Sequence, residues 1–161
     1  MNQQREFSAR MDNLDAAMAF VQAFCAEHLV ASDDGLRLQL VVEELFTNTV
    51  THGHGGDCDS PVVVELAVEA DGLGLRFTDW APAFDPTAVV AIKSAVPEQV
   101  GGAGLRLLAS LAREMAYARI DGANRLTLTL TLAGRSVAVA LENSRENAAP
   151  PPPAAQSNSE P

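Results

Sequence analysis

Apolar and polar residues alternate along the chain with two different periods, which predicts a mixture of helices and strands. Apolar side chains recur every three or four residues over 14–29 and 32–51, as along the buried face of a helix. Asn13 is placed to cap the first helix, and Ser32 begins the second, with acidic residues in its first turn. The buried face predicted for the second helix consists of Leu38, Val41, Val42, Leu45 and Thr49.

A period of two predicts the strands of a sheet. The expected strands are a short one through Phe7, Ala9 and Met11, a hairpin of 61–68 and 73–78 about Asp71–Gly72, a hairpin of 117–120 and 125–132 about a turn at 121–124, and a further strand at 136–141. Leucines alternate with threonines in the 125–132 strand, which is typical of a sheet with one buried and one polar face.

A third helix is predicted over 104–116, after a connection at 80–100 that contains three prolines. Connections of this length inside a compact domain are usually functional. Periodicity is lost from Asn143 onward, where four consecutive prolines precede a polar end. We therefore expect one folded domain over 1–142 and a disordered, proline-rich tail over 143–161.

The 161 residues include 21 Asp and Glu against 11 Lys and Arg, a formal net charge of −10. This excess argues against direct binding to nucleic acid or to an anionic membrane, because both partners require a basic surface. No apolar run is long enough to span a membrane, and no signal peptide is evident, so we expect a cytoplasmic protein whose two cysteines are reduced.

Glu44, Asn48 and His52 are spaced four apart on the second predicted helix and so share one stripe. A carboxylate, a carboxamide and an imidazole could bind a metal–phosphate group or move a proton. The spacing alone favours a solvated polar edge. A metal site in the segment from His52 to Cys58 is disfavoured, because the paired ligand spacing is missing.

Two further segments carry candidate chemistry. Asp79 ends a predicted strand, where its carboxylate could accept a hydrogen bond from an exocyclic amine or simply make a turn. Residues 101–104 form a glycine-rich start to a helix, where unpaired N–H groups could hold a phosphate. Each signal is weak on its own, since the spacing fits neither the Rossmann fingerprint nor a P-loop.

In this order, the three segments resemble the GHKL ATPase superfamily, and within it the anti-sigma factor serine/threonine kinases of the RsbW/SpoIIAB type. Residues 43–53 resemble the N box, 79–86 the first glycine box, and 101–105 the Gly-Gly-x-Gly-Leu second box. The resemblance covers about residues 7–133. It implies an α+β fold, a two-layer sandwich in which helices cover one face of a mixed, mostly antiparallel sheet.

The resemblance also implies roles. Glu44 is the expected general base, with Glu43 as a competitor that points about 100° away around the helix. Asn48 is expected to hold Mg²⁺ between the ATP phosphates, and Asp79 to accept from the adenine amino group. The residues expected around the nucleotide are Asn48, Asp79, Ala81, Gly101, Gly102, Gly104, Leu105 and Thr127.

Two departures bear on catalysis. Ala81 stands where the family usually has glycine, which would cost about 1 kcal/mol if the position required a positive φ. Gln99 and Val100 stand where some members have a basic residue before the glycines. Phosphates would then be held by Mg²⁺ and backbone N–H groups, so ATP binding should depend strongly on magnesium.

The resemblance predicts an ATP-dependent serine/threonine kinase and anti-sigma factor that phosphorylates an antagonist protein of the STAS type and regulates transcription by partner switching. Its expected partners are that antagonist and a sigma factor, and homodimers are common in the family. The alternative is a non-catalytic ATP-binding module that inhibits a partner by sequestration. A histidine kinase domain is disfavoured, because no dimerisation helices with a phosphoacceptor histidine precede the ATPase part.

Overall fold

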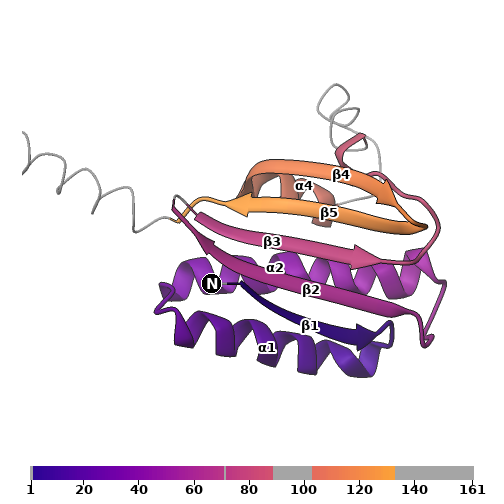
Figure 1. Ribbon diagram of the computed structural model, residues 1–161, viewed down its shortest axis with the longest axis horizontal. Coiled ribbons are helices and arrows are strands. Elements are labelled where there is room, and N and C mark those ends of the chain that lie inside the picture. The colour runs from indigo at the N-terminus through magenta and orange to yellow at the C-terminus, as the bar shows by residue number, and fades with distance from the viewer. Residues whose placement is uncertain (1, 71, 89–102, 133–161) are drawn as a thin grey trace, which may run out of the picture.

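The computed structural model describes residues 2–70, 72–88 and 103–132, which form two layers (Figure 1). A twisted sheet makes one layer, and the helices lie against a single face of it. The elements, in chain order, are β1 (Asn2–Ser8), η1 (Met11–Asn13), α1 (Leu14–Glu27), α2 (Ser32–Asn48), η2 (Thr49–Gly53), β2 (Pro61–Glu69), β3 (Gly72–Asp79), α4 (Ala103–Leu111), β4 (Ala112–Ile120) and β5 (Ala123–Leu130).

The sheet has the strand order β1-β2-β3-β5-β4, and all four of these pairings are antiparallel. The predicted fold class, an α+β sandwich with helices on one face, is therefore confirmed. Among the residues described, every helix is too short or too polar to cross a membrane.

The strands bury one face because their apolar residues fall on alternate positions. Register pairs Leu73 with Leu130, Leu75 with Leu128 and Phe77 with Leu126, and all six side chains are buried against the helices. The alternation of leucine with threonine thus predicted the buried face of β5 correctly.

Helix α2 supplies the other side of the core. The five residues predicted for its buried face are all buried, together with Phe46. The ring of Phe46 meets Phe7 of β1 edge to face, with centroids 6.2 Å apart, and Phe7 also contacts Phe20 of α1. These contacts join the first strand to both long helices.

Boundaries near the N-terminus differ from the prediction. The first strand is Asn2–Ser8, so Met11 lies in the 3₁₀ turn that follows rather than in the strand. Asn13 does not cap α1 through its side chain, because its Nδ2 donates instead to the Ser8 carbonyl at 3.0 Å. The amide therefore fixes the exit from β1 instead of the start of the helix.

The predicted helix over 104–116 was wrong in its second half. Helix α4 ends at Leu111, and residues 112–116 belong to β4, because their backbone pairs with β5. Ala, Arg, Glu and Met favour helices in isolation, and sheet pairing overrides that preference here. The β4–β5 turn is Asp121–Gly122, both with positive φ, as expected of a two-residue hairpin turn.

Several predicted features lie outside the described residues: Asp71 of the first hairpin turn, most of the long connection, the strand at 136–141 and the tail at 143–161. Gly72 pairs with Glu69, so it belongs to β3 and not to the turn predicted at Asp71–Gly72. Cys25 and Cys58 are free thiols, and burial raises the pKa of the Cys25 thiol.

The contact between α1 and α2 makes a stability prediction. A methyl group added at Gly35 would lie 3.5 Å from the Cys25 sulfur, an ordinary packing distance. Gly35→Ala should therefore raise the free energy of unfolding by about 0.5–1 kcal/mol in urea titrations, because alanine favours a helix. The matched control Gly122→Ala should lower it by about 1 kcal/mol, because Gly122 has a φ of +79°. A destabilised Gly35→Ala protein would contradict the packing described.

Candidate functional site

Polar side chains from four elements meet at one end of the helix-covered face of the sheet. Asp79 is the last residue of β3, and its register partner Asn124 is the second residue of β5. Thr49 follows α2 directly and donates its hydroxyl to Asp79 Oδ2 at 3.4 Å. The end of α2 is thereby attached to the strand that carries the aspartate.

Asp79 is 8% exposed, and its two carboxylate oxygens have different surroundings. Oδ1 accepts from the Ala81 backbone N–H at 2.9 Å and from Asn124 Nδ2 at 2.8 Å. Oδ2 accepts only the long bond from Thr49 among the hydrogen bonds of the described residues. Asp79 therefore makes the turn that one interpretation of the sequence gave it, and still has acceptor capacity for a ligand.

Ala81 fits its position without backbone strain. Among the described residues, only Leu29 and Asp121 combine a side chain with a positive φ, so Ala81 does not need the freedom of glycine. Its methyl group is buried and lies against Gly53, where an added Cβ would come within 2.8 Å of the Ala81 Cβ. The space for the Ala81 methyl is thus provided by Gly53 at the end of η2.

Glu44 and Asn48 form a pair one turn apart on α2. Asn48 Nδ2 donates to Glu44 Oε1 at 2.7 Å, and both side chains are half-buried. Among the described residues, no hydrogen bond is made to Asn48 Oδ1, an oxygen ligand of the kind that Mg²⁺ prefers together with phosphate oxygens and water. In the part of the chain described, no three His, Cys, Asp or Glu side chains gather as a metal site of their own.

The predicted stripe stops at Asn48. The backbone changes there from an α-helix to a π-helix over Thr49–Gly53, and His52 is exposed on that turn. Insertions of π-helix often occur at functional sites. Here the π-helix places Thr49 in contact with Asp79 and Gly53 in contact with Ala81. The prediction of a continuous α-helix did not include these two contacts. Glu43 is exposed and lies on the neighbouring side of the helix.

The first turn of α4 lies against Glu44. A Cβ built on Gly104 would overlap the Glu44 carboxylate, so only glycine is accommodated beside this arrangement of the acid. The N-terminus of a helix stabilises a negative charge, whether a carboxylate or a phosphate. Leu105 follows in the same turn, whereas Gly101 and Gly102 lie outside the described residues.

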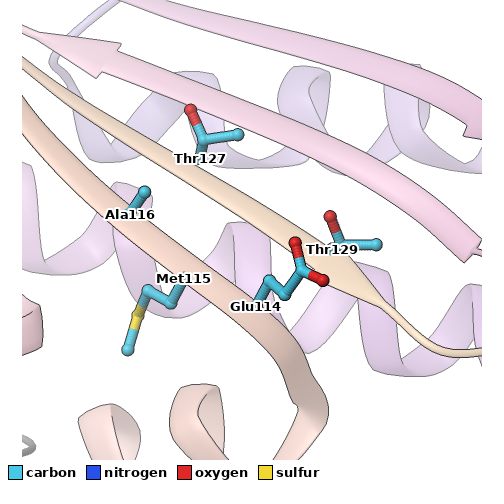
Figure 2. Close-up of a pocket in the computed structure, with 5 residues that line it drawn as sticks. All are labelled: Glu114, Met115, Ala116, Thr127 and Thr129. Atoms are coloured by element: carbon cyan, nitrogen blue, oxygen red, sulfur yellow. The ribbon is translucent and has the colours of Figure 1, made fainter.

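Thr127 does not join the cluster. It pairs with Arg76 and lies on the outer face of the sheet, because side chains alternate and its neighbours Leu126 and Leu128 point to the helices. Figure 2 shows Thr127 beside Ala116 on this face, where it lines a depression of about 390 Å³. Thr127 therefore lies on the opposite face of the sheet from Asp79, and its expected place in the adenine pocket stays a prediction.

The β5 residue that lies beside Asp79 is Asn124, which was not among the predicted site residues. Extending the buried series Leu130, Leu128 and Leu126 back by two positions leads to Asn124, so the signal was present. Its Oδ1 accepts from Tyr117 and Arg119 of β4 at 2.9 and 2.7 Å, which places both residues beside the site.

Two curated proteins are similar to this chain in sequence. The chain is 28% identical over 134 residues to the serine/threonine-protein kinase BtrW of Bordetella bronchiseptica, covering 76% of this chain and 94% of that protein. It is 32% identical over 90 residues to an anti-sigma F factor of Bacillus velezensis, covering 50% of this chain and 60% of that protein.

Two solved structures share the fold. The RsbU and RsbW domains of Rv1364c from Mycobacterium tuberculosis match with a TM-score of 0.59 at 19% identity, over 82% of this chain and 32% of that one. The SiaB-SiaC complex from Pseudomonas aeruginosa matches with a TM-score of 0.60 at 12% identity, over 80% and 88%. The sequence profile of the histidine kinase-like ATPase domain family matches residues 7–132, nearly all of the described fold. The chain therefore belongs to that family.

Proposed function

We propose that this protein is an ATP-dependent serine/threonine kinase and anti-sigma factor that phosphorylates an antagonist protein of the STAS type in the cytoplasm. The observation that carries the proposal is the hydrogen-bonded pair of Glu44 and Asn48, held on the same helix end that reaches Asp79 through Thr49. The names of the two relatives, a serine/threonine kinase and an anti-sigma factor, support the same activity. Exchange between the antagonist and a sigma factor would then regulate transcription.

Asp79 is proposed to bind the adenine base. Its Oδ1 is occupied by two protein donors, so Oδ2 is the oxygen that would accept the 6-amino group. Asn124 and the Ala81 backbone keep the carboxylate in place without taking that oxygen. Burial among these donors favours a base that offers a hydrogen to Oδ2 over one that presents a carbonyl there.

The phosphates are proposed to lie between α2 and the start of α4, near Gly101, Gly102, Gly104 and Leu105. When bound, Mg²⁺ would neutralise phosphate charge, and Asn48 Oδ1 is the protein oxygen proposed to hold it. Asn48 Nδ2 is turned to Glu44, so the amide has its oxygen available for the metal. The N–H groups at the α4 N-terminus would contact phosphate oxygens.

Glu44 is proposed as the general base. It would accept the proton of the incoming serine or threonine hydroxyl as that oxygen bonds to the γ-phosphorus and ADP leaves. Oε1 already accepts from Asn48, which holds the carboxylate one helical turn from the metal ligand. With this geometry, the Asn48 side chain would both position the base through Nδ2 and ligate the metal through Oδ1.

A second function is supported by the contact between Glu44 and α4. The carboxylate lies against the helix turn proposed for phosphate, at Gly104. A protein fixed in this arrangement would sequester its partner without transferring phosphate. The two functions differ in one measurable step, the transfer of labelled phosphate from ATP to a serine of the antagonist.

Glu44→Ala should abolish that transfer, with a loss of about 10²–10⁴-fold, because it removes the general base. MgATP should bind at least as tightly as to the wild type, because the Glu44 carboxylate no longer lies at the helix turn proposed for phosphate. Phosphate transfer from labelled ATP to a candidate antagonist measures the rate, and calorimetry measures ATP affinity. Glu43→Ala is the matched control and should keep wild-type transfer. Normal turnover by Glu44→Ala would rule out Glu44 as the base.

Asn48→Ala should weaken ATP binding by about 10-fold or more in magnesium and make it insensitive to EDTA, because the metal ligand is lost. Trp80 is the single tryptophan of the chain and adjoins Asp79, so its fluorescence can follow the titration. Asn48→Asp retains an oxygen ligand and should bind MgATP more tightly than Asn48→Ala. An Asn48→Ala protein with wild-type affinity and magnesium dependence would contradict the assignment.

Gly104→Ala should break the pair of Glu44 and Asn48, because the new methyl group overlaps the Glu44 carboxylate. The side-chain amide resonance of Asn48 should move toward its position in Glu44→Ala, and phosphate transfer should fall by about 10–100-fold. Gly35→Ala adds a methyl group where there is room and serves as the control. An unchanged Asn48 resonance in Gly104→Ala would show that α4 does not contact Glu44 in solution.

A further inference from the structure

Arg119 connects the edge strand β4 to the loop that leaves Asp79. One guanidinium nitrogen, Nη1, donates to the Ala81 carbonyl at 2.8 Å and to Asn124 Oδ1 at 2.7 Å. The same group therefore holds the backbone two residues after Asp79 and the side chain that bonds Asp79. Charged donors make stronger and shorter hydrogen bonds than neutral ones.

These contacts fix the orientation of the Asn124 carboxamide. Every described partner of its Oδ1 is a donor: the Arg119 guanidinium, the Tyr117 hydroxyl and the Phe84 N–H. Every described partner of its Nδ2 is an acceptor: Asp79 Oδ1 and the carbonyls of Ala81 and Pro82. Turning the amide over would place its NH₂ group against a cation, so Arg119 favours the observed orientation strongly.

The orientation of Asn124 determines what Asp79 can accept. Asn124 Nδ2 and the Ala81 N–H both donate to Asp79 Oδ1, and Arg119 holds a group on each of these two residues. Oδ2 is thereby the oxygen left for a ligand. If Asn124 or the loop were free to move, either carboxylate oxygen could turn toward the ligand, and the site would lose its defined acceptor.

We propose that Arg119 is a positioning residue for base selectivity: by holding Asn124 and the Ala81 peptide, it makes Asp79 distinguish a 6-amino purine from a 6-oxo purine nucleotide. The inference rests on the proposed binding of adenine to Asp79. Tyr117 assists through its bond to Asn124 Oδ1. Arg119 acts from the edge strand, on Asn124 and the Ala81 carbonyl.

The test compares the dissociation constants of ATP and inosine triphosphate, each with magnesium, for the full chain. Inosine triphosphate has the same phosphates and ribose and presents a 6-oxo group. In Arg119→Met, ATP should bind about 5–20-fold more weakly, while the inosine nucleotide changes less than about twofold, so the preference for ATP falls. Arg119→Lys restores a cation on a similar stem and should recover part of the preference.

Matched variants separate positioning from a structural role. Arg76→Met removes an arginine from the outer face of the same sheet, where it bonds Glu65, and should keep the wild-type preference. Tyr117→Phe removes one donor to Asn124 and should reduce the preference by about 2–5-fold, which tests the network even if Arg119→Met folds poorly.

Three outcomes decide the matter. A preference for ATP that falls in Arg119→Met and Tyr117→Phe and returns with Arg119→Lys supports the inference. Equal weakening of both nucleotides in Arg119→Met, or no change in either, overturns it while leaving the proposed function intact. A wild-type protein that binds neither nucleotide, or both equally, overturns the proposed function and this inference with it.

Discussion

The Asp79 carboxylate is buried at the meeting point of four elements, and the local structure follows from the need to satisfy it. A buried carboxylate is costly unless hydrogen bonds replace water, and here the donors come from η2, the loop after β3, and β5. Each donor constrains its own element: the π-helix brings Thr49 inward, the loop folds back at Ala81, and β5 begins early enough to include Asn124. The position of one charged group thus links the end of the helix layer to the sheet.

Hydrophobic period predicted α1, α2, the β2–β3 hairpin and the buried faces of α2 and β5. It failed where tertiary pairing decides the outcome. Residues 112–116 have helix-favouring side chains, but their backbone pairs with β5. Thr127 lies on the outer face of the sheet, because the register places it opposite Arg76. The shift from α- to π-helix after Asn48 leaves no periodic signal, so the contacts of Thr49 and Gly53 could not be derived from spacing.

The substitution of alanine for glycine at position 81 also looks different in three dimensions. From the sequence, alanine at this position is expected to be destabilising, because glycine in the family motif suggests a strained backbone. The structure shows an unstrained Ala81 whose methyl packs on Gly53, more than twenty residues away in the chain. A glycine is still required where the loop after β3 meets the end of η2, and in this chain that glycine is Gly53 and not residue 81. Departures from a motif are therefore best judged in pairs of contacting residues.

The acidic composition gives the Glu44–α4 contact a particular meaning. The chain has a formal charge of −10, so the partial positive charge at the N-terminus of α4 is a favourable position for an anion in an otherwise acidic protein. The Glu44 carboxylate now lies there, at Gly104. On the proposed function, phosphate would compete for the same helix turn, and the two anions repel each other at close range. Phosphate binding would then move Glu44 away from α4, which leaves the base free for an incoming hydroxyl. The same electrostatic competition would suppress the base until nucleotide is bound.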